Sequence, residues 1–283
     1  LLVGFKPDWK RRLDGAQAAG ADVLQVLFRS ADAQLAHMGI SRAQAHDRVV
    51  EIIQYAKAQR FPLIQFEPSF VTRADWTFLE TLYKDAVAAG AHQVGVSDSM
   101  GVARPAAIRY LVSRIKALTG VPVQIHCHND FGVGLANTLA GIEAGASIAD
   151  VSVGGLGERT GGACLDELVL ALEGLYGVRL GIDMAELNDL AKFLEKLTGV
   201  PIPPMKPVVG ANCFAQKLDI HVMLTAEKPE LLEPYDPSLV GNRRGLRLGR
   251  GTGPLGVKAK LRELGLTLTE EKVIGYNTNA KVN

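Results

Sequence analysis

Short apolar runs alternate with longer amphipathic segments along most of the chain. The apolar runs are rich in branched side chains, which is typical of buried strands. We expect strands at residues 1–5, 22–28, 62–66, 93–97, 121–128 and 148–153. The segments between them repeat their apolar positions at helical spacing. We expect helices at residues 8–20, 41–59, 75–90, 105–118, 134–145 and 165–175.

Three similar phrases mark the junctions between helices and strands. They read AAGADVLQV, AAGAHQVGV and EAGASIADVSV, and each holds a helix end, a glycine and the start of the next strand. A glycine in the left-handed conformation is a common way to end a helix. Repeated strand–helix units of this kind predict a parallel sheet with right-handed crossovers. Because we find six units and a closed barrel needs eight, we expect a TIM-type (β/α)8 barrel whose first two strands are missing from this chain.

The pattern changes after Gly181. A further helix is expected at residues 183–198, and a proline-rich extended stretch follows it. We therefore divide the chain into a barrel catalytic domain at 1–180, a helix and linker at 181–207 and a small C-terminal subdomain at 208–283. The glycine-rich basic stretch 241–256 is expected to be a solvated loop, with an RNA or an anionic cofactor as alternative partners.

Composition narrows the functional class. The chain has 283 residues, 47% of them hydrophobic, and a net charge of +1, so no strong field attracts nucleic acid or a membrane. No apolar run approaches the ~20 residues of a membrane span. The three cysteines show no CxxC spacing, which favours a reducing, cytoplasmic location. The chain begins with Leu1 rather than methionine, so we expect a fragment of a longer protein.

Two histidines, His126 and His128, stand one residue apart at the end of an apolar strand. Side chains alternate between the two faces of a strand, so both imidazoles should point the same way and Cys127 the other way. Two imidazoles on one face can bind one metal ion. The alternative is a pair of hydrogen-bonded histidines in the core.

Other polar residues follow the predicted strands at the end where barrel enzymes place their catalytic groups. They are Glu67, Asp98, Ser99 and Ser152. Together with the histidines they suit a divalent cation such as Mn, Zn, Co or Mg, which could hold the oxygens of an α-keto acid. The loop 154–162, GGLGERTGG, offers backbone N–H groups to an anion. Within it, Glu158 and Arg159 either take part in binding or form an ion pair that braces the loop.

The longest motif is HCHNDFGVGLANTLAGIEAGASIADVSVGGLGERTGG, at residues 126–162. With Asp-Ser-Met-Gly at 98–101, it resembles the HMGL-like, or DRE-TIM metallolyase, family. The stretch 203–241, PPMKPVVGANCFAQKLDIHVMLTAEKPELLEPYDPSLVG, resembles the C-terminal subdomain of its synthase branch. That branch holds the isopropylmalate, homocitrate and citramalate synthases.

The resemblance implies a divalent-metal-dependent condensation of an acyl-CoA, expected to be acetyl-CoA, with a 2-oxoacid. It implies that His126 and His128 are metal ligands and that Ser99 contacts the oxoacid carboxylate. Glu67 lies where the family has a glutamate near the substrate. His221 matches a histidine used for acid–base chemistry, which reaches the neighbouring subunit of a homodimer with exchanged C-terminal segments. Further substrate contacts are expected from Asp98, Gly157, Glu158 and Arg159.

The chain also departs from the family pattern. It lacks the first-strand R-D-G-x-Q motif, and Gly162 stands where the family has a metal-binding asparagine. The family's tail motif GIHxDG reads Asp-Ile-His-Val-Met-Leu at 219–224, and Leu232 replaces a tyrosine. Two alternatives therefore stay open: a C–C bond lyase or aldolase of the same superfamily, and a catalytically impaired homologue that acts as a binding module.

Overall fold

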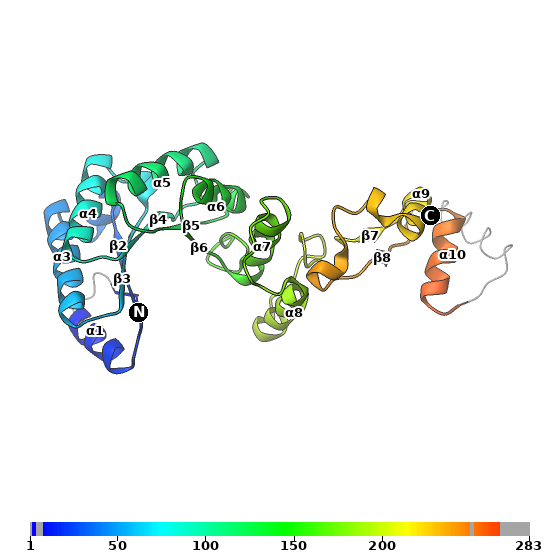
Figure 1. The fold of residues 1–283 in the computed structure, drawn as a ribbon, viewed down its shortest axis with the longest axis horizontal. Helices are drawn as coiled ribbons and strands as arrows, with labels where there is room; N and C mark the ends of the chain where they lie inside the picture. Colours follow the sequence, from blue (N-terminus) through cyan, green and yellow to red (C-terminus); the bar gives the residue numbers. More distant parts are fainter. Residues whose placement is uncertain (1, 4–7, 250–251, 267–283) are drawn as a thin grey trace. The chain divides into compact units, whose positions relative to one another are not determined.

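The computed structural model describes residues 2–3, 8–249 and 252–266. The chain divides into two compact units, Leu1–Leu168 and Val169–Asn283, which are considered separately below. Figure 1 shows the elements of both units in chain order.

The first unit is built on a parallel sheet whose strands follow one another in chain order. The strands are β1 (Leu2–Val3), β2 (Val23–Arg29), β3 (Leu63–Ser69), β4 (Gln93–Asp98), β5 (Val123–Cys127) and β6 (Ile148–Asp150). Each strand pairs with the next, and among the described residues β1 and β6 pair on one side only. The sheet is therefore an unclosed six-stranded part of a barrel, which confirms the predicted architecture.

Helices cover the outer face of this sheet (Figure 1). They are α1 (Trp9–Ala18), α2 (Asp32–His37), α3 (Arg42–Ala58), α4 (Trp76–Ala89), α5 (Pro105–Thr119) and α6 (Gly134–Glu143), with a short 3-10 turn η1 (Val71–Arg73) before α4. Alternate strand residues such as Leu24, Ile64 and Val94 are fully buried in the core with helix residues such as Ile52 and Ile108. The alternate positions include polar side chains such as Gln65, Ser97 and Gln124, so the inner face of the sheet is chemically distinct from its outer face.

Local sequence signals explain where the long helices begin and end. Ser41 and Gln44 form a reciprocal capping box at the start of α3, and the Asp75 side chain accepts a hydrogen bond from the Phe78 N–H at the start of α4. Gly120 ends α5 in the left-handed conformation. These elements match their predicted ranges closely, whereas the short helix α2 was not predicted.

The second unit consists of helices with one small sheet. Its elements are most of α7 (Leu165–Gly174), then η3 (Met184–Glu186), α8 (Leu187–Thr198), β7 (Ala215–Gln216), α9 (Asp219–Glu227), η4 (Pro229–Leu231), η5 (Pro237–Val240), β8 (Gly245–Leu246) and α10 (Pro254–Glu263). The Asp219 carboxylate at the start of α9 accepts the backbone N–H groups of Gly253, Leu255 and Gly256 at the start of α10. This side chain ties the two helices together at their N-terminal ends.

The basic stretch 241–256 is partly neutralised within this unit. Arg244 forms ion pairs with Glu233 at 2.7 Å and Asp236 at 2.9 Å, and Arg247 donates to the Asn212 side chain at 2.7 Å. The stretch was predicted to be a solvated loop, whereas its described residues include β8 and the start of α10.

His46 on α3 provides a pH-dependent contact between helices. Its Nδ1 lies 3.0 Å from Asp47 Oδ1, and its Nε2 lies 2.8 Å from Asp85 Oδ2 on α4. Hydrogen bonds to Asp47 and Asp85 raise the pKa of His46 above its usual 6.5. The charged form therefore contributes stability that is fully present below about pH 6.5 and is lost as the pH rises through the raised pKa.

We expect the His46→Gln variant to lose about 0.5–1 kcal/mol of unfolding free energy at pH 6 and little at pH 9. Urea unfolding at the two pH values measures the difference. The exposed His37, changed to Gln, is the control. Equal losses for His46→Gln at both pH values would contradict this account.

Candidate functional site

His126 on β5 and His128, one residue past its end, lie together on the inner face of the sheet. The ring centroids of His126 and His128 are 4.9 Å apart with an interplanar angle of 74°. With Asp150, Glu158 and Gly162 they line a pocket of about 330 Å³. The predicted same-face arrangement is therefore present in a cavity open to a ligand.

Asp150, at the end of β6, is the main residue of this pocket that the sequence did not reveal. The β5–β6 register sets it beside His126, and its Oδ2 lies 2.9 Å from His126 Nδ1. Burial lowers the pKa of His126, but the hydrogen bond to Asp150 and its charge outweigh burial, so the net pKa is raised.

The sixth strand was predicted to continue to residue 153, but it ends at Asp150. Ser152 instead forms a parallel bridge with Cys164, and Gly154 takes a φ of 64° just beyond it. The chain turns away from the sheet here, which makes Asp150 rather than Ser152 the residue at the strand end.

His128 has a different environment from His126. Its Nδ1 atom is buried and makes no hydrogen bond of ordinary geometry with the described residues. Burial and the neighbouring His126 lower the pKa of this ring. A neutral imidazole with an unused buried nitrogen is suited to metal binding.

Arg159 braces the loop that follows β6. It has a φ of 58°, and its guanidinium group donates to both carboxylate oxygens of Asp130, at 2.7 and 2.9 Å. It also donates to the Ser99 carbonyl at 2.9 Å. Glu158 is 4.0 Å from Arg159 and its side chain is 89% exposed. The brace is thus formed with Asp130, and Glu158 remains accessible at the pocket.

Asp98 and Ser99 organise the loop after β4. The Asp98 carboxylate is fully buried and accepts hydrogen bonds from the Thr72 hydroxyl and from the N–H groups of Val102 and Ala103. The Ser99 hydroxyl oxygen accepts the Phe70 N–H at 2.8 Å. Its hydrogen can still be donated to a ligand, so Ser99 is better placed than Asp98 for a substrate contact.

Glu67 is buried in a network of polar side chains on the inner face. Its carboxylate accepts hydrogen bonds from Ser97 and from three glutamine amides, those of Gln25, Gln65 and Gln124. On β5, Gln124 pairs with Gly95, whereas His126 pairs with Ser97. Because Glu67 packs against Gly95, it lies one layer deeper in the sheet than His126. A substrate contact by Glu67 stays a prediction.

Two glycines of the loop approach the histidines. The Gly162 backbone forms an antiparallel bridge with His128, and a Cβ at Gly162 would meet only the Cys127 carbonyl, at 3.4 Å. A Cβ at Gly157 would lie 3.2 Å from the Gly161 Cα. The surroundings of Gly162 therefore leave room for a Cβ.

His126 and His128 are the two side chains of this pocket that were predicted to bind a metal ion. Among the residues that the structure describes, one group of three metal-type side chains has ligand atoms within 4.8 Å of one another, namely Cys164, Asp166 and Glu167. That group starts α7, where the helix dipole favours anions over cations. The role of His126 and His128 as metal ligands stays a prediction, in which two imidazoles would supply half of a tetrahedral shell.

Comparisons with known proteins identify the family of this chain. A family model described as HMGL-like matches residues 8–194, and one described as homocitrate synthase post-HMGL domain-like matches residues 208–282. The chain belongs to the HMGL-like family. The resemblance of its motifs to this family is thereby confirmed.

Relatives of this HMGL-like chain are named as synthases. A probable 2-isopropylmalate synthase of Ignicoccus hospitalis is 41% identical over 94% of this chain and 67% of its own length. A homocitrate synthase of Methanopyrus kandleri is 37% identical over 92% of this chain and 66% of its own length. A putative (R)-citramalate synthase of Archaeoglobus fulgidus is 37% identical over 96% of this chain and 56% of its own length. The chain thus spans about two thirds or less of these relatives.

Solved structures of the same fold include lyases. An HMG-CoA lyase from Acenitobacter baumannii, in complex with coenzyme A and 3-methylmalate, has a TM-score of 0.59 and 25% identity. The match covers 68% of this chain and 67% of that one. The Bacillus subtilis HMG-CoA lyase has a TM-score of 0.62 and 21% identity, and the match covers 71% of this chain and 70% of that one. At this identity the likeness supports the fold alone.

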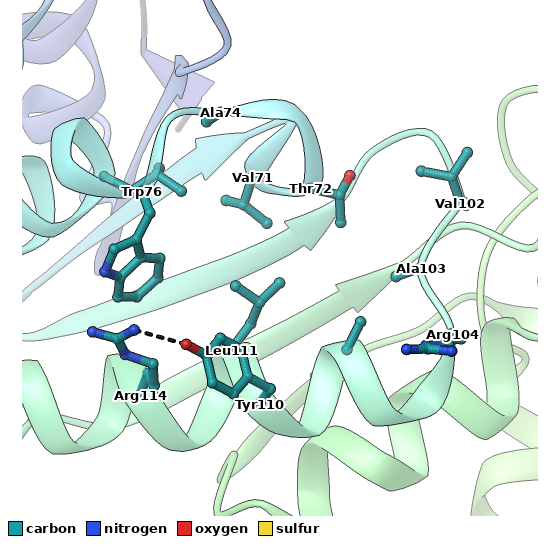
Figure 2. Close-up of a pocket in the computed structure, with 12 residues that line it drawn as sticks. Val71, Thr72, Ala74, Trp76, Val102, Ala103, Arg104, Tyr110, Leu111 and Arg114 are labelled. Carbon is teal, nitrogen blue, oxygen red and sulfur yellow. Dashed lines mark hydrogen bonds between the residues drawn. The ribbon is translucent and has the colours of Figure 1, made fainter.

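A larger groove lies on the helical face of this HMGL-like chain. It measures about 780 Å³ and lies between η1, the start of α4, and α5 (Figure 2). Arg114 lies over the Trp76 ring at 4.3 Å and donates to the Tyr110 hydroxyl at 2.7 Å, while Arg104 lies at the other end. Its twelve lining residues include no carboxylate, imidazole or thiol.

His221 lies on α9, in the second unit. Its acid–base role at the site of a neighbouring subunit stays a prediction.

Of the helices described, none is long and apolar enough to span a bilayer.

Proposed function

We propose that the protein condenses an acyl-CoA, with acetyl-CoA as the expected donor, with a 2-oxoacid, and that the reaction depends on a divalent cation. The observation that carries the proposal is the pair His126 and His128 facing a pocket beside the family's glycine-rich loop. Members of the family use a divalent metal. The names of the relatives, isopropylmalate, homocitrate and citramalate synthase, support the substrate classes.

The roles of the residues follow from their contacts. His126 and His128 would hold the cation, which supplies Lewis-acid polarisation of the oxoacid carbonyl when bound. Two imidazole ligands favour Zn or Co, with Mn or Mg as further candidates. Ser99 is free to donate its hydroxyl hydrogen to the oxoacid carboxylate, and the Arg159–Asp130 brace keeps the loop backbone in place. Glu158, exposed at the pocket, is available to a polar group of the substrate.

Proton removal from the acyl group is assigned to His221. A base must take a proton from the acyl methyl so that the resulting carbanion equivalent attacks the keto carbon, and water then releases CoA. We propose that His221 acts on the site of a second subunit, in a homodimer with exchanged C-terminal segments and two-fold symmetry.

A subunit-mixing experiment tests this proposal. Neither His221→Ala nor His126→Ala chains should be active alone, whereas a mixed dimer should regain one intact site. The assay follows CoA release from acetyl-CoA with pyruvate, 2-oxoisovalerate or 2-oxoglutarate, using purified mixed dimers that carry two different tags. Mixed dimers without activity would contradict the exchanged site, and a monomer at micromolar concentration would contradict the dimer.

The alternatives give different results in the same assay. A lyase or aldolase would split a hydroxyacid and leave acetyl-CoA unconsumed. A binding module would bind substrate without turnover, an alternative that rests on the absence of a side chain at Gly162.

A further inference from the structure

We propose that Asp150 is a positioning residue that fixes the tautomer of His126, so that Nε2 is the atom presented to the metal. The inference rests on the metal-binding part of the proposed function. It does not depend on which substrates are condensed.

The contact comes from the strand register rather than from a flexible loop. β5 and β6 pair in parallel with His126 directly beside Asp150, and this pairing brings Oδ2 to 2.9 Å from Nδ1. The two preceding pairs of the same ladder, Gln124 with Ile148 and Ile125 with Ala149, hold the strand ends in place. A side chain that leaves a paired strand is better fixed than one on a loop.

The chemistry of the contact determines the tautomer. An ionised carboxylate only accepts hydrogen bonds, so Nδ1 must carry the hydrogen. In the neutral ring, Nε2 then keeps its lone pair. Histidines that bind metals commonly donate their other N–H to a carboxylate in this way, and loss of such a partner typically lowers metal affinity by about 10- to 100-fold.

The neighbouring polar groups serve other partners. Ser97, on the opposite side of His126 in the register, donates its hydroxyl to Glu67. His128 Nδ1 has no hydrogen bond of ordinary geometry among the described residues. The two imidazoles are therefore not equivalent, because Nδ1 of His126 has a carboxylate partner and Nδ1 of His128 has no such partner among the described residues.

The exposure of Asp150 indicates which of its two effects on His126, the hydrogen bond or the negative charge, is the larger. Its side chain is 44% exposed, so solvent screens its charge, and the hydrogen-bond geometry is the main contribution. Asparagine keeps an oxygen that can accept the Nδ1 hydrogen, whereas alanine does not. The two variants should therefore behave differently if Asp150 positions His126, and alike if Asp150 is itself a metal ligand.

The test measures Zn²⁺ affinity by calorimetry for the wild-type chain and for Asp150→Asn, Asp150→Ala and His126→Ala. We expect Asp150→Asn to bind within about threefold of the wild type and Asp150→Ala to bind about 10- to 100-fold more weakly. His126→Ala should be weaker still. Asp47→Asn is the matched control, because Asp47 contacts His46 Nδ1 at 3.0 Å on α3, away from β5 and β6.

Imidazole ¹⁵N spectra of the metal-free chain provide a second readout. The signal that disappears in His126→Ala should show a protonated Nδ1 in the wild type and a mixture of tautomers in Asp150→Ala. Four results would each overturn the proposal. Two concern the variants: wild-type Zn²⁺ affinity in Asp150→Ala, or equal losses of affinity in all three site variants. Two concern the wild type: an Nε2–H tautomer of His126, or no Zn²⁺ binding. If the affinities follow the expected order but no substrate is turned over, the proposed condensation fails while the role of Asp150 stands.

Discussion

Alanine in place of His126 or His128 should remove the specific metal binding of this chain and leave its fold intact. Each imidazole would supply one of the two proposed protein ligands. Its loss should therefore weaken metal binding by more than the factor of about 10 to 100 that follows from losing an outer-shell partner. The His126 side chain is 30% exposed and lies on the polar inner face, so its truncation opens no apolar cavity.

Elemental analysis after dialysis against Zn²⁺ or Mn²⁺ measures the metal content, and thermal unfolding measures the fold. His37→Ala, an exposed histidine on α2, serves as the control. Unchanged metal content in both variants would mean that the pair is a structural feature of the core and not a metal site.

Two neighbouring glycines should respond in opposite ways to substitution. Gly161 has a φ of 76°, and a Cβ there would lie 1.7 Å from the Gly155 carbonyl oxygen. A side chain at Gly161 is strained by the backbone and blocked by an atom that belongs to the same loop. Gly161→Ala should therefore lower the free energy of unfolding by roughly 2–4 kcal/mol and displace the loop from the histidines.

Gly162 offers the matched contrast. It is outside the left-handed region, and its Cβ would meet only the Cys127 carbonyl, at an ordinary 3.4 Å. Gly162→Asn should fold normally and add an amide oxygen beside the histidines, which should tighten Zn²⁺ binding by on the order of tenfold, or about 1.4 kcal/mol.

Calorimetric titration and urea unfolding of both variants test this pair. Gly162→Ala, which adds a methyl group without a ligand atom, controls for the backbone effect. An Asn variant that folds well and binds Zn²⁺ no better would show that the shell is completed in another way.

The helices and the strand order could be predicted because their signals are local. Residues 41–59 carry both an N-cap serine and a helical period, and the structure places α3 at Arg42–Ala58. The same-face placement of His126 and His128 follows from the alternation of a strand and needs no tertiary information. α2 was missed because six residues without a side-chain cap give too little pattern.

The contacts of the site could not be predicted because they join strands that are distant in sequence. Asp150 meets His126 through the β5–β6 register, and the apolar alternation up to residue 153 gave no sign that the strand ends at Asp150. Glu67 accepts hydrogen bonds from side chains on β2, β3, β4 and β5, which only the assembled sheet brings together. One of the two alternatives for Arg159 paired it with its neighbour Glu158, whereas its bidentate partner Asp130 lies 29 positions away.

The contact of Asp219 with the start of α10 has an evolutionary consequence. A Cβ at Gly253 would lie 2.0 Å from the Asp219 carboxylate, and one at Gly256 would lie 2.6 Å from Thr252 Cγ2 and 3.0 Å from Asp219. Substitutions at these positions are therefore epistatic: a side chain at Gly253 requires a change at Asp219, and one at Gly256 requires a change at Thr252 as well. His221 also lies on α9. Which substitutions are tolerated at the start of this helix therefore depends on two glycines more than thirty positions further along the chain.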